Sequence, residues 1–268
     1  MTRFDRDIAV TRAADGGFDL RIDRGWWIVM GPNGGYVAAL VLRALEAALG
    51  DPTRAPRSLT VHYVEPAVEG PARVHVRVER SGRSLSTLSA RLEQDGRLVA
   101  LALAAFGRTR DSLEFQDLQM PEVAPPERLE ARQPTNARTV PMRERFETRP
   151  ALGSIEPGTS SRAVTGGWLR LAEPRIPDAP ALAMFCDAWP PAIAQRQAFG
   201  PEGLRGVPTI DLTVHFRAPL PAHARPDDFY LCVFRSQTAR NGFVEEDGEI
   251  WTRDGVLLAQ SRQLALLL

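Results

Sequence analysis

The tetrapeptide Leu59-Thr60-Val61-His62 occurs again, 153 residues later, as Leu212-Thr213-Val214-His215. The same spacing relates the prolines that follow the two copies. Further along, Asp95-Gly96 and the apolar residues after it resemble Asp254-Gly255 and the residues that follow there. One repeated tetrapeptide is weak evidence, but several matches in the same order indicate a duplicated domain.

Each copy shows the same order of predicted elements. In the first copy, alternation predicts a strand over 18–23, and apolar residues at helical spacing predict a helix over 36–49. Four further strands are expected at about 57–65, 72–80, 84–94 and 97–107. In the second copy we expect a strand at 163–171, a helix at 181–199, and strands near 209–217, 228–236, 242–252 and 256–267.

A single helix lying across a curved antiparallel sheet is the hotdog arrangement. The sequence therefore predicts an α+β tandem (double) hotdog, in which each half is a long helix packed on a curved antiparallel sheet. We expect an N-terminal hotdog over 1–110, a linker over 111–139 that is rich in proline, glutamate and arginine, and a C-terminal hotdog over 140–268.

Composition excludes several classes of protein. The chain has 33 basic and 33 acidic residues, and all of the basic residues are arginine. With no net charge and no basic cluster, nucleic-acid binding has little support. The sequence has neither a long apolar run nor a signal peptide, and two cysteines do not make a disulfide framework, so we expect a cytoplasmic protein that does not bind membranes. Four histidines without paired ligand spacing predict no metal site.

Asp187 is a candidate for chemistry because it lies inside the apolar segment 181–194. A carboxylate there must be paired, hydrogen-bonded, neutralised or exposed by a bend, because burying it bare is costly. It is then either a general base that holds a water molecule, or a cap at the point where Pro190 and Pro191 break the helix. The sequence leaves both interpretations open.

Thr209 and Gln263 lie on two of the predicted strands of the second copy. Threonine favours strands, so Thr209 in isolation indicates only a strand. Gln263 shares its face with small residues, which leave room either for a narrow ligand or for close packing against a helix.

The C-terminal half resembles the type II acyl-CoA thioesterases, double-hotdog enzymes of the thioesterase-like superfamily. Residues 185–193 (Phe-Cys-Asp-Ala-Trp-Pro-Pro-Ala-Ile) resemble the helix segment that bears that family's catalytic aspartate. Residues 209–219 resemble the strand with its catalytic threonine, and residues 257–263 the last strand with its catalytic glutamine. Residues 31–36 (Gly-Pro-Asn-Gly-Gly-Tyr) are similar to the glycine-rich entry to the family's first long helix.

The resemblance implies that Asp187, Thr209 and Gln263 are the catalytic residues. The double proline after Asp187 departs from the family pattern and puts the helix geometry there in doubt. At the repeat spacing, Asp187 falls opposite Gly34 and Thr209 opposite Pro56, so we infer one catalytic site per chain, where the two halves meet.

The expected reaction is hydrolysis of acyl-CoA thioesters to free acid and CoA by direct attack of water. Asp187 would act as general base, while Thr209 and Gln263 would hold the water. The backbone N–H groups of Gly34 and Gly35 at a helix start are expected to stabilise the oxyanion. No Gly-x-Ser-x-Gly motif supports a serine nucleophile.

The expected partner is the acyl-CoA substrate, and no cofactor is predicted because CoA is part of that substrate. Arg240 and Arg83 lie in corresponding hairpins and are candidates for contacts with the CoA phosphates. A homodimer or higher homo-oligomer is expected from edge-to-edge pairing of open sheets. Two alternatives stay open: a non-catalytic acyl-CoA-binding or regulatory protein, and an enoyl-CoA hydratase or dehydratase, against which the lack of a histidine between Asp187 and His215 counts.

Overall fold

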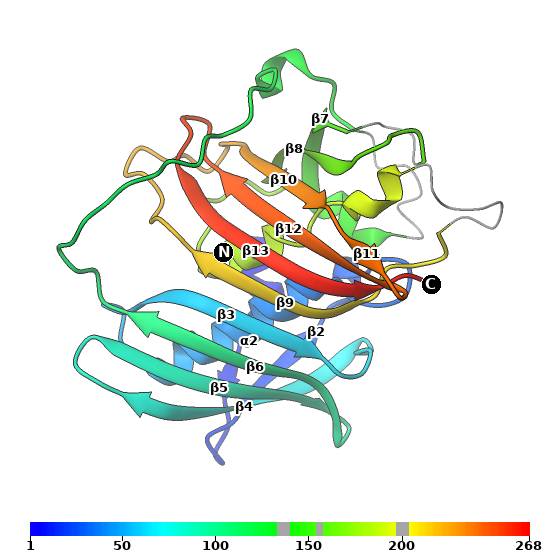
Figure 1. Cartoon of the computed structure of the whole chain (residues 1–268). Coiled ribbons are helices and arrows are strands. Elements are labelled where there is room, and N and C mark those ends of the chain that lie inside the picture. Colours follow the sequence, from blue (N-terminus) through cyan, green and yellow to red (C-terminus); the bar gives the residue numbers. More distant parts are fainter. Residues whose placement is uncertain (133–139, 154–157, 197–203) are drawn as a thin grey trace.

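A computed structural model describes residues 1–132, 140–153, 158–196 and 204–268. In these residues a 13-stranded antiparallel sheet runs through the whole molecule (Figure 1). Its strands in chain order are β1 (Thr11–Arg12), β2 (Phe18–Ile22), β3 (Ala55–Tyr63), β4 (Gly70–Ser81), β5 (Leu85–Gln94), β6 (Arg97–Gly107), β7 (Phe146–Leu152), β8 (Ala163–Leu171), β9 (Thr209–Phe216), β10 (Tyr230–Ser236), β11 (Ala239–Arg240), β12 (Phe243–Trp251) and β13 (Leu257–Leu266).

The order of the strands in space is the same in both halves when read outward from the middle. The sheet runs β1-β2-β4-β5-β6-β3-β9-β13-β12-β10-β8-β7, so β3 and β9 form its centre. The two copies of the repeated tetrapeptide lie antiparallel at this centre, with Thr60 opposite Thr213. The two threonine hydroxyls are 3.0 Å apart. The sequence repeat is therefore the contact across which the halves join into one sheet.

The helices of the described part are α1 (Arg3–Asp7), α2 (Gly34–Leu49) and α3 (Ala179–Phe185). Short 3₁₀ turns cover Arg24–Trp26, Pro126–Arg128, Pro141–Arg145 and Ala192–Gln195. None of the helices in the described ranges is long and apolar enough to cross a membrane.

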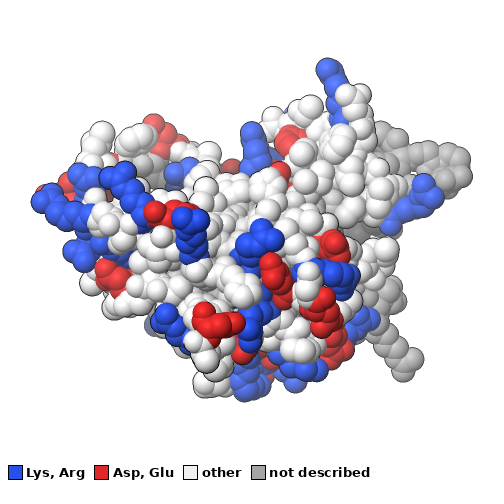
Figure 2. Space-filling model, turned by 90° about the horizontal axis from the view of Figure 1, so that it is seen from below, with Lys and Arg blue, Asp and Glu red and all other residues white. Residues whose placement is uncertain are grey.

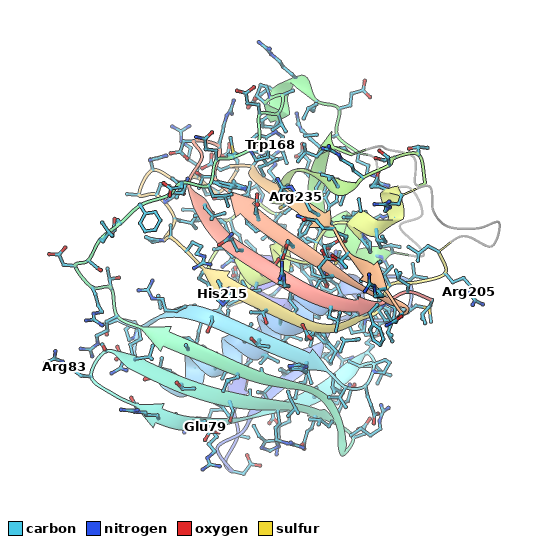
Figure 3. All side chains as sticks on the ribbon, viewed as in Figure 1. Glu79, Arg83, Trp168, Arg205, His215 and Arg235 are labelled. Atoms are coloured by element: carbon cyan, nitrogen blue, oxygen red, sulfur yellow. The ribbon has the colours of Figure 1, made fainter. Side chains whose placement is uncertain are left out.

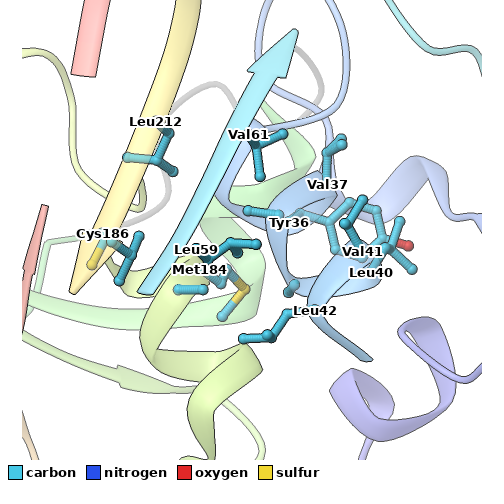
Figure 4. Packing of buried hydrophobic residues seen from close by; sticks show 14 of the residues in the cluster. Tyr36, Val37, Leu40, Val41, Leu42, Leu59, Val61, Met184, Cys186 and Leu212 are labelled. Carbon is cyan, nitrogen blue, oxygen red and sulfur yellow. The ribbon is translucent and has the colours of Figure 1, made fainter. Parts of the chain in front are cut away.

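Helix α2 is the centre of the main hydrophobic core. Asn33 caps its start by accepting a hydrogen bond from Tyr36 N–H, and Gly50, in the left-handed conformation, ends it. Its side chains from Tyr36 to Leu42 are all buried, because the sheet covers one face and α3 packs against another. Figure 4 shows this packing, with Met184 and Cys186 meeting strands β3 and β9 beside α2. From Tyr36 to Leu42 the helix is apolar on all sides because it is covered on all sides.

The second helix differs from the prediction. A helix was expected over 181–199, but α3 ends at Phe185, and Ala192–Gln195 form only a 3₁₀ turn. The prolines at 190 and 191 explain this, because a proline lacks an N–H and disfavours helical geometry in the residue before it. Residues 197–199 lie outside the described residues.

The expected linker follows a path over the second half rather than forming a core of its own. It has no helix or strand between Arg108 and Pro125. Met120 and Val123 pack against a small cluster that includes Trp168 and Leu231, and Trp168 Nε1–H donates to the carbonyl of Ala124. Residues 133–139 lie outside the described part.

Basic and acidic side chains are interspersed on the face of the molecule shown in Figure 2. This distribution agrees with the absence of net charge in the sequence. Several charged side chains of the molecule form ion pairs at the surface, such as Arg262 with Asp247 at 2.6 Å. Exposed pairs of this kind contribute little to stability.

Gly35 lies at a close approach between α2 and α3. A Cβ atom at this position would lie 2.6 Å from the carbonyl oxygen of Met184. Gly35→Ala is therefore expected to push the end of α3 away and to lower the free energy of unfolding by about 1–3 kcal/mol, as overpacking does. Urea unfolding measures this difference.

The matched control is Gly31→Ala, because a Cβ atom there would have no neighbour within 4 Å. Its unfolding midpoint should stay close to that of the unmodified protein. Equal midpoints for the two variants would contradict the assigned contact between α2 and α3.

Candidate active site

Asp187 follows the last turn of α3, and the start of α2 holds it in place. Asn33 Nδ2 donates to the Asp187 Oδ2 atom at 2.9 Å and to the Asp187 carbonyl oxygen at 2.7 Å. The backbone N–H of Gly35 donates to the same Oδ2 atom at 3.0 Å. Asn33 is only 2% exposed. The carboxylate therefore lies at the positive end of the α2 dipole, where backbone N–H groups have no partner within the helix.

Two opposing effects set the protonation of Asp187. Burial raises its pKa to about 6. Hydrogen bonds from Gly35 N–H, the Gln263 side chain, Gly34 N–H and the Asn33 side chain lower the pKa and stop it from rising further. Asp187 is partly exposed as a residue, and a pKa of about 6 allows its carboxylate to take up a proton near neutral pH.

The structure brings the three predicted catalytic side chains together. The Thr209 hydroxyl donates to Gln263 Oε1 at 2.8 Å. The side chain of Gln263 in turn hydrogen-bonds to Asp187. Thr209, at the start of β9, is partly exposed, whereas Gln263, near the end of β13, is buried. Asp187 and Thr209 thus form the accessible part of the cluster, and Gln263 joins them from behind.

Glu246 is a residue of this cluster that the sequence analysis missed. It lies on β12, opposite Gln263 on β13, and its Oε1 atom accepts from Gln263 Nε2 at 2.9 Å. Its other oxygen accepts from the backbone N–H of Ala192 at 2.5 Å. Burial raises the pKa of Glu246 to about 7, and the charge of Asp187 adds to this effect. The alternation of β12, which turns Val244 and Ile250 inward, is a signal that could have placed Glu246 in the interior.

The N-terminal half contributes one more side chain. The hydroxyl of Tyr63, at the end of β3, donates to the carbonyl of Gly34 at 2.7 Å. Burial, followed by the charges of Asp187 and Asp211, raises the pKa of Tyr63 well above its usual value. The phenol therefore stays neutral, and the site is built from both halves of the chain.

The backbone groups predicted to stabilise an oxyanion have a different partner. Gly35 N–H donates to Asp187, and Gly34 N–H also hydrogen-bonds to that carboxylate. The Gly35 N–H thus holds the base, and a role of Gly34 and Gly35 in stabilising an oxyanion stays a prediction from the sequence. The two glycines also provide space, because a Cβ atom at Gly34 would lie 3.0 Å from the carboxylate.

The two candidate arginines lie at opposite ends of the sheet. Arg240 on β11 pairs with Phe243, which pairs with Leu266 on β13, so Arg240 lies toward the end of the sheet that holds Thr209. Arg83 is in the hairpin between β4 and β5, at the far left of Figure 3, whereas β11 lies on the right of Figure 1. The structure therefore does not bring Arg83 to the Asp187 cluster, because β3 runs the whole way between them, on the order of 25 Å.

The histidines offer little to this site. His215, labelled in Figure 3, lies near the end of β9, whereas Thr209 begins that strand. His215 pairs with Ser58 and Gln260. Among the described residues, no group of three or more histidine, cysteine, aspartate or glutamate side chains could hold a metal ion.

The corresponding positions in the first half are apolar. Gln263 pairs with Leu212 on one side and Glu246 on the other. In the first half, Leu59 matches Leu212, and its neighbours across the sheet are Ala104 and then Leu88. These three side chains are fully buried. The polar cluster therefore occurs in one half, as the repeat comparison predicted for Asp187 and Thr209.

The contact between Asn33 and Asp187 generates a prediction about the pKa of the carboxylate. Asn33→Ala and Asn33→Ser both remove the Nδ2 donor, so the pKa of Asp187 is expected to rise above about 6 in both variants. Infrared or carboxyl NMR titration measures it.

Serine keeps an oxygen that can cap Tyr36 N–H, whereas alanine also loses about 1 kcal/mol of stability with the cap. The serine variant thus separates the effect on Asp187 from the effect on α2. An unchanged Asp187 titration in both variants would contradict the assigned hydrogen bond.

Comparison with known proteins identifies the family. The acyl-CoA thioesterase N-terminal domain matches residues 23–107, and the acyl-CoA thioesterase C-terminal domain matches residues 121–267. A protein of unknown function with a hotdog fold from Alicyclobacillus acidocaldarius superimposes with a TM-score of 0.86 at 28% identity, over 100% of this chain and 98% of that one.

Two mycobacterial proteins are also similar. The acyl-CoA thioesterase II TesB2 from Mycobacterium marinum has the same fold, with a TM-score of 0.79 at 21% identity over 100% and 97% of the two chains. An uncharacterised protein of Mycobacterium tuberculosis is 26% identical over 93% of this chain and 90% of its own length. Because the two thioesterase domains together match most of the sequence, the chain belongs to the acyl-CoA thioesterase family.

Proposed function

We propose that the protein hydrolyses acyl-CoA thioesters to the free acid and CoA with a water molecule activated at the Asp187 cluster. The observation that carries the proposal is the meeting of Asp187, Thr209 and Gln263 in a chain of this family. Asp187 has the properties of a general base, because its pKa of about 6 leaves it ionised at neutral pH yet basic enough to accept a proton.

The direction of the hydrogen bonds determines how the water is held. The Thr209 hydroxyl uses its one proton on Gln263 Oε1. The Thr209 oxygen can therefore only accept a hydrogen bond from a water molecule, and the Asp187 carboxylate also accepts one. A water that donates one proton to each of them presents its lone pairs to the thioester carbonyl, which is the orientation that attack needs.

Arg240 is the arginine that we retain for the CoA phosphates, because it lies on the side of the sheet that holds the cluster. Its guanidinium is exposed and suited to bidentate phosphate contacts. A homodimer or higher homo-oligomer and a cytoplasmic location remain predictions from the sequence.

A panel of acyl-CoA esters, assayed by thiol titration, tests the proposal. The unmodified protein should release free CoA, and Asp187→Asn should lower kcat by about 10²–10⁴-fold, the usual contribution of a general base. Asparagine keeps one oxygen that can accept from Gly35, so the variant should fold. Binding of acyl-CoA without thiol release would instead support a regulatory protein, and hydration of enoyl-CoA a hydratase.

Asp247→Asn is the matched control, because Asp247 lies on the opposite face of β12 from Glu246 and pairs with the exposed Arg262. Its turnover should match that of the unmodified protein. Normal turnover in Asp187→Asn would overturn the proposed mechanism.

The pH dependence follows from the Asp187 pKa. A general base must be ionised, and burial places the folded-state pKa at about 6, above its value of about 3.9 in an unfolded chain. Turnover should therefore fall as the pH is lowered through about 6. The same shift means that the folded state binds this proton more tightly, so the stability gained from it is lost as the pH rises through about 6. Rate and thermal unfolding profiles between pH 4 and 9 measure both effects; a rate that does not change across this range would contradict the role of Asp187.

A further inference from the structure

Glu246 is a buried carboxylate that forms no ion pair with any arginine or histidine in the described part of the chain. Both of its oxygens accept hydrogen bonds from neutral N–H groups, one on Gln263 and one on the backbone of Ala192. Its side chain lies behind Gln263 and is 7% exposed. Keeping such a group in the interior costs free energy, so its presence calls for an explanation.

The fold itself does not require a carboxylate here. In the first half, the position equivalent to Glu246 is Leu88, and the position equivalent to Gln263 is Ala104. Both side chains are fully buried and pack in the core. The same sheet geometry is thus built with an apolar pair in one half and a polar pair in the other, and the polar pair occurs in the half that holds Asp187.

We propose that Glu246 is a positioning residue that sets the direction of the hydrogen bonds from Gln263 through Thr209 to the attacking water. This inference rests on the proposed hydrolysis. A carboxylate accepts and cannot donate, so it turns the amide of Gln263 until its NH₂ group faces Glu246. The carbonyl of the amide then faces Thr209 and takes the proton of the hydroxyl.

The orientation of the Gln263 amide determines which hydrogen bonds Thr209 can make with the attacking water. With its proton used on Gln263, Thr209 can only accept from the water. The second N–H of the Gln263 amide is left for Asp187, which agrees with the hydrogen bond between these two side chains. A reversed amide would leave the Thr209 proton free to bind the lone pairs of the water, which are the electrons needed for attack.

The ionised form of Glu246 is the form that fixes the amide. The charged groups that interact with Glu246 are Asp187, at the end of α3, and Glu245, on the same strand. Asp187 in turn interacts electrostatically with Tyr63 and Cys186. Burial and the Asp187 charge raise the pKa of Glu246 to about 7. A protonated Glu246 would have an O–H to donate and would favour the reversed amide.

The experiment is steady-state kinetics of Glu246→Gln with an acyl-CoA that the unmodified protein hydrolyses. The new amide must offer its oxygen to Ala192 N–H, so its NH₂ group faces Gln263 and reverses that amide. We expect kcat to fall about 10- to 100-fold, as for a misoriented reactant, with little change in KM or in the melting temperature. The acid side of the rate profile should also become less steep, because one of the two carboxylates that must lose a proton is gone.

Two further variants make the test specific. Glu249→Gln changes a carboxylate on the same strand but the opposite face, which pairs with Arg235, and it should leave kcat unchanged. In a Thr209→Val background there is no hydroxyl to orient, so adding Glu246→Gln should lower kcat much less than it does alone.

The outcomes separate this inference from the proposed function. If the unmodified protein releases no thiol, the proposed hydrolysis fails. Suppose instead that the unmodified protein releases thiol and that Asp187→Asn abolishes this release. The inference alone is then overturned if Glu246→Gln has a normal kcat. It is also overturned if the effects of Glu246→Gln and Thr209→Val on kcat multiply. If Glu246→Gln does not fold, Glu246→Asp replaces it in the test, because aspartate keeps the acceptor charge. The rate of this variant must still fall steeply on the acid side of the pH profile. Loss of that steep fall would also overturn the inference.

Discussion

The structure depends on how one carboxylate is accommodated beside the start of a buried helix. Asp187 comes from the second half of the chain, and the N–H groups and Asn33 that satisfy it come from the first half. The arrangement needs α2 and α3 to approach closely, which only a glycine at position 35 permits. The candidate site therefore lies at the join between the halves, which the pairing of β3 with β9 also forms.

Much of this organisation could be predicted from the sequence because its signals are local. Alternation located the longer strands of both halves but missed β1, β7 and β11. The repeat of Leu59–His62 at Leu212–His215 marked the strands that meet at the centre. The helical spacing after residue 35 gave α2 almost to the residue. The second helix was predicted too long, because apolar residues continue past Phe185 although the prolines end the helix.

What the sequence could not supply is register and the partners of polar groups. Glu246 stands in a run of acidic residues, and although the alternation of β12 turns it inward, the sequence does not show that Gln263 is its partner. The glycines at 34 and 35 are expected from the sequence to be donors for an oxyanion, yet the N–H of Gly35 donates to Asp187, 152 residues away. The hairpin arginines looked equivalent in the repeat, but an antiparallel join sends equivalent positions to opposite ends of the sheet.

The same antiparallel join explains why one site can use residues from both halves. Rotation of one half onto the other brings the start of β9 beside the end of β3, so Thr209 comes near Tyr63, and the end of α3 meets the start of α2. The pseudo-equivalent location at the other end of β3 has Pro56, Leu88 and Ala104, which offer no side-chain donor or acceptor. One end of the sheet is thus packed for stability, while the other carries two buried carboxylates whose pKa values are raised toward neutrality. Burying these charges lowers stability, and that loss is confined to the end of the sheet where a water could be oriented.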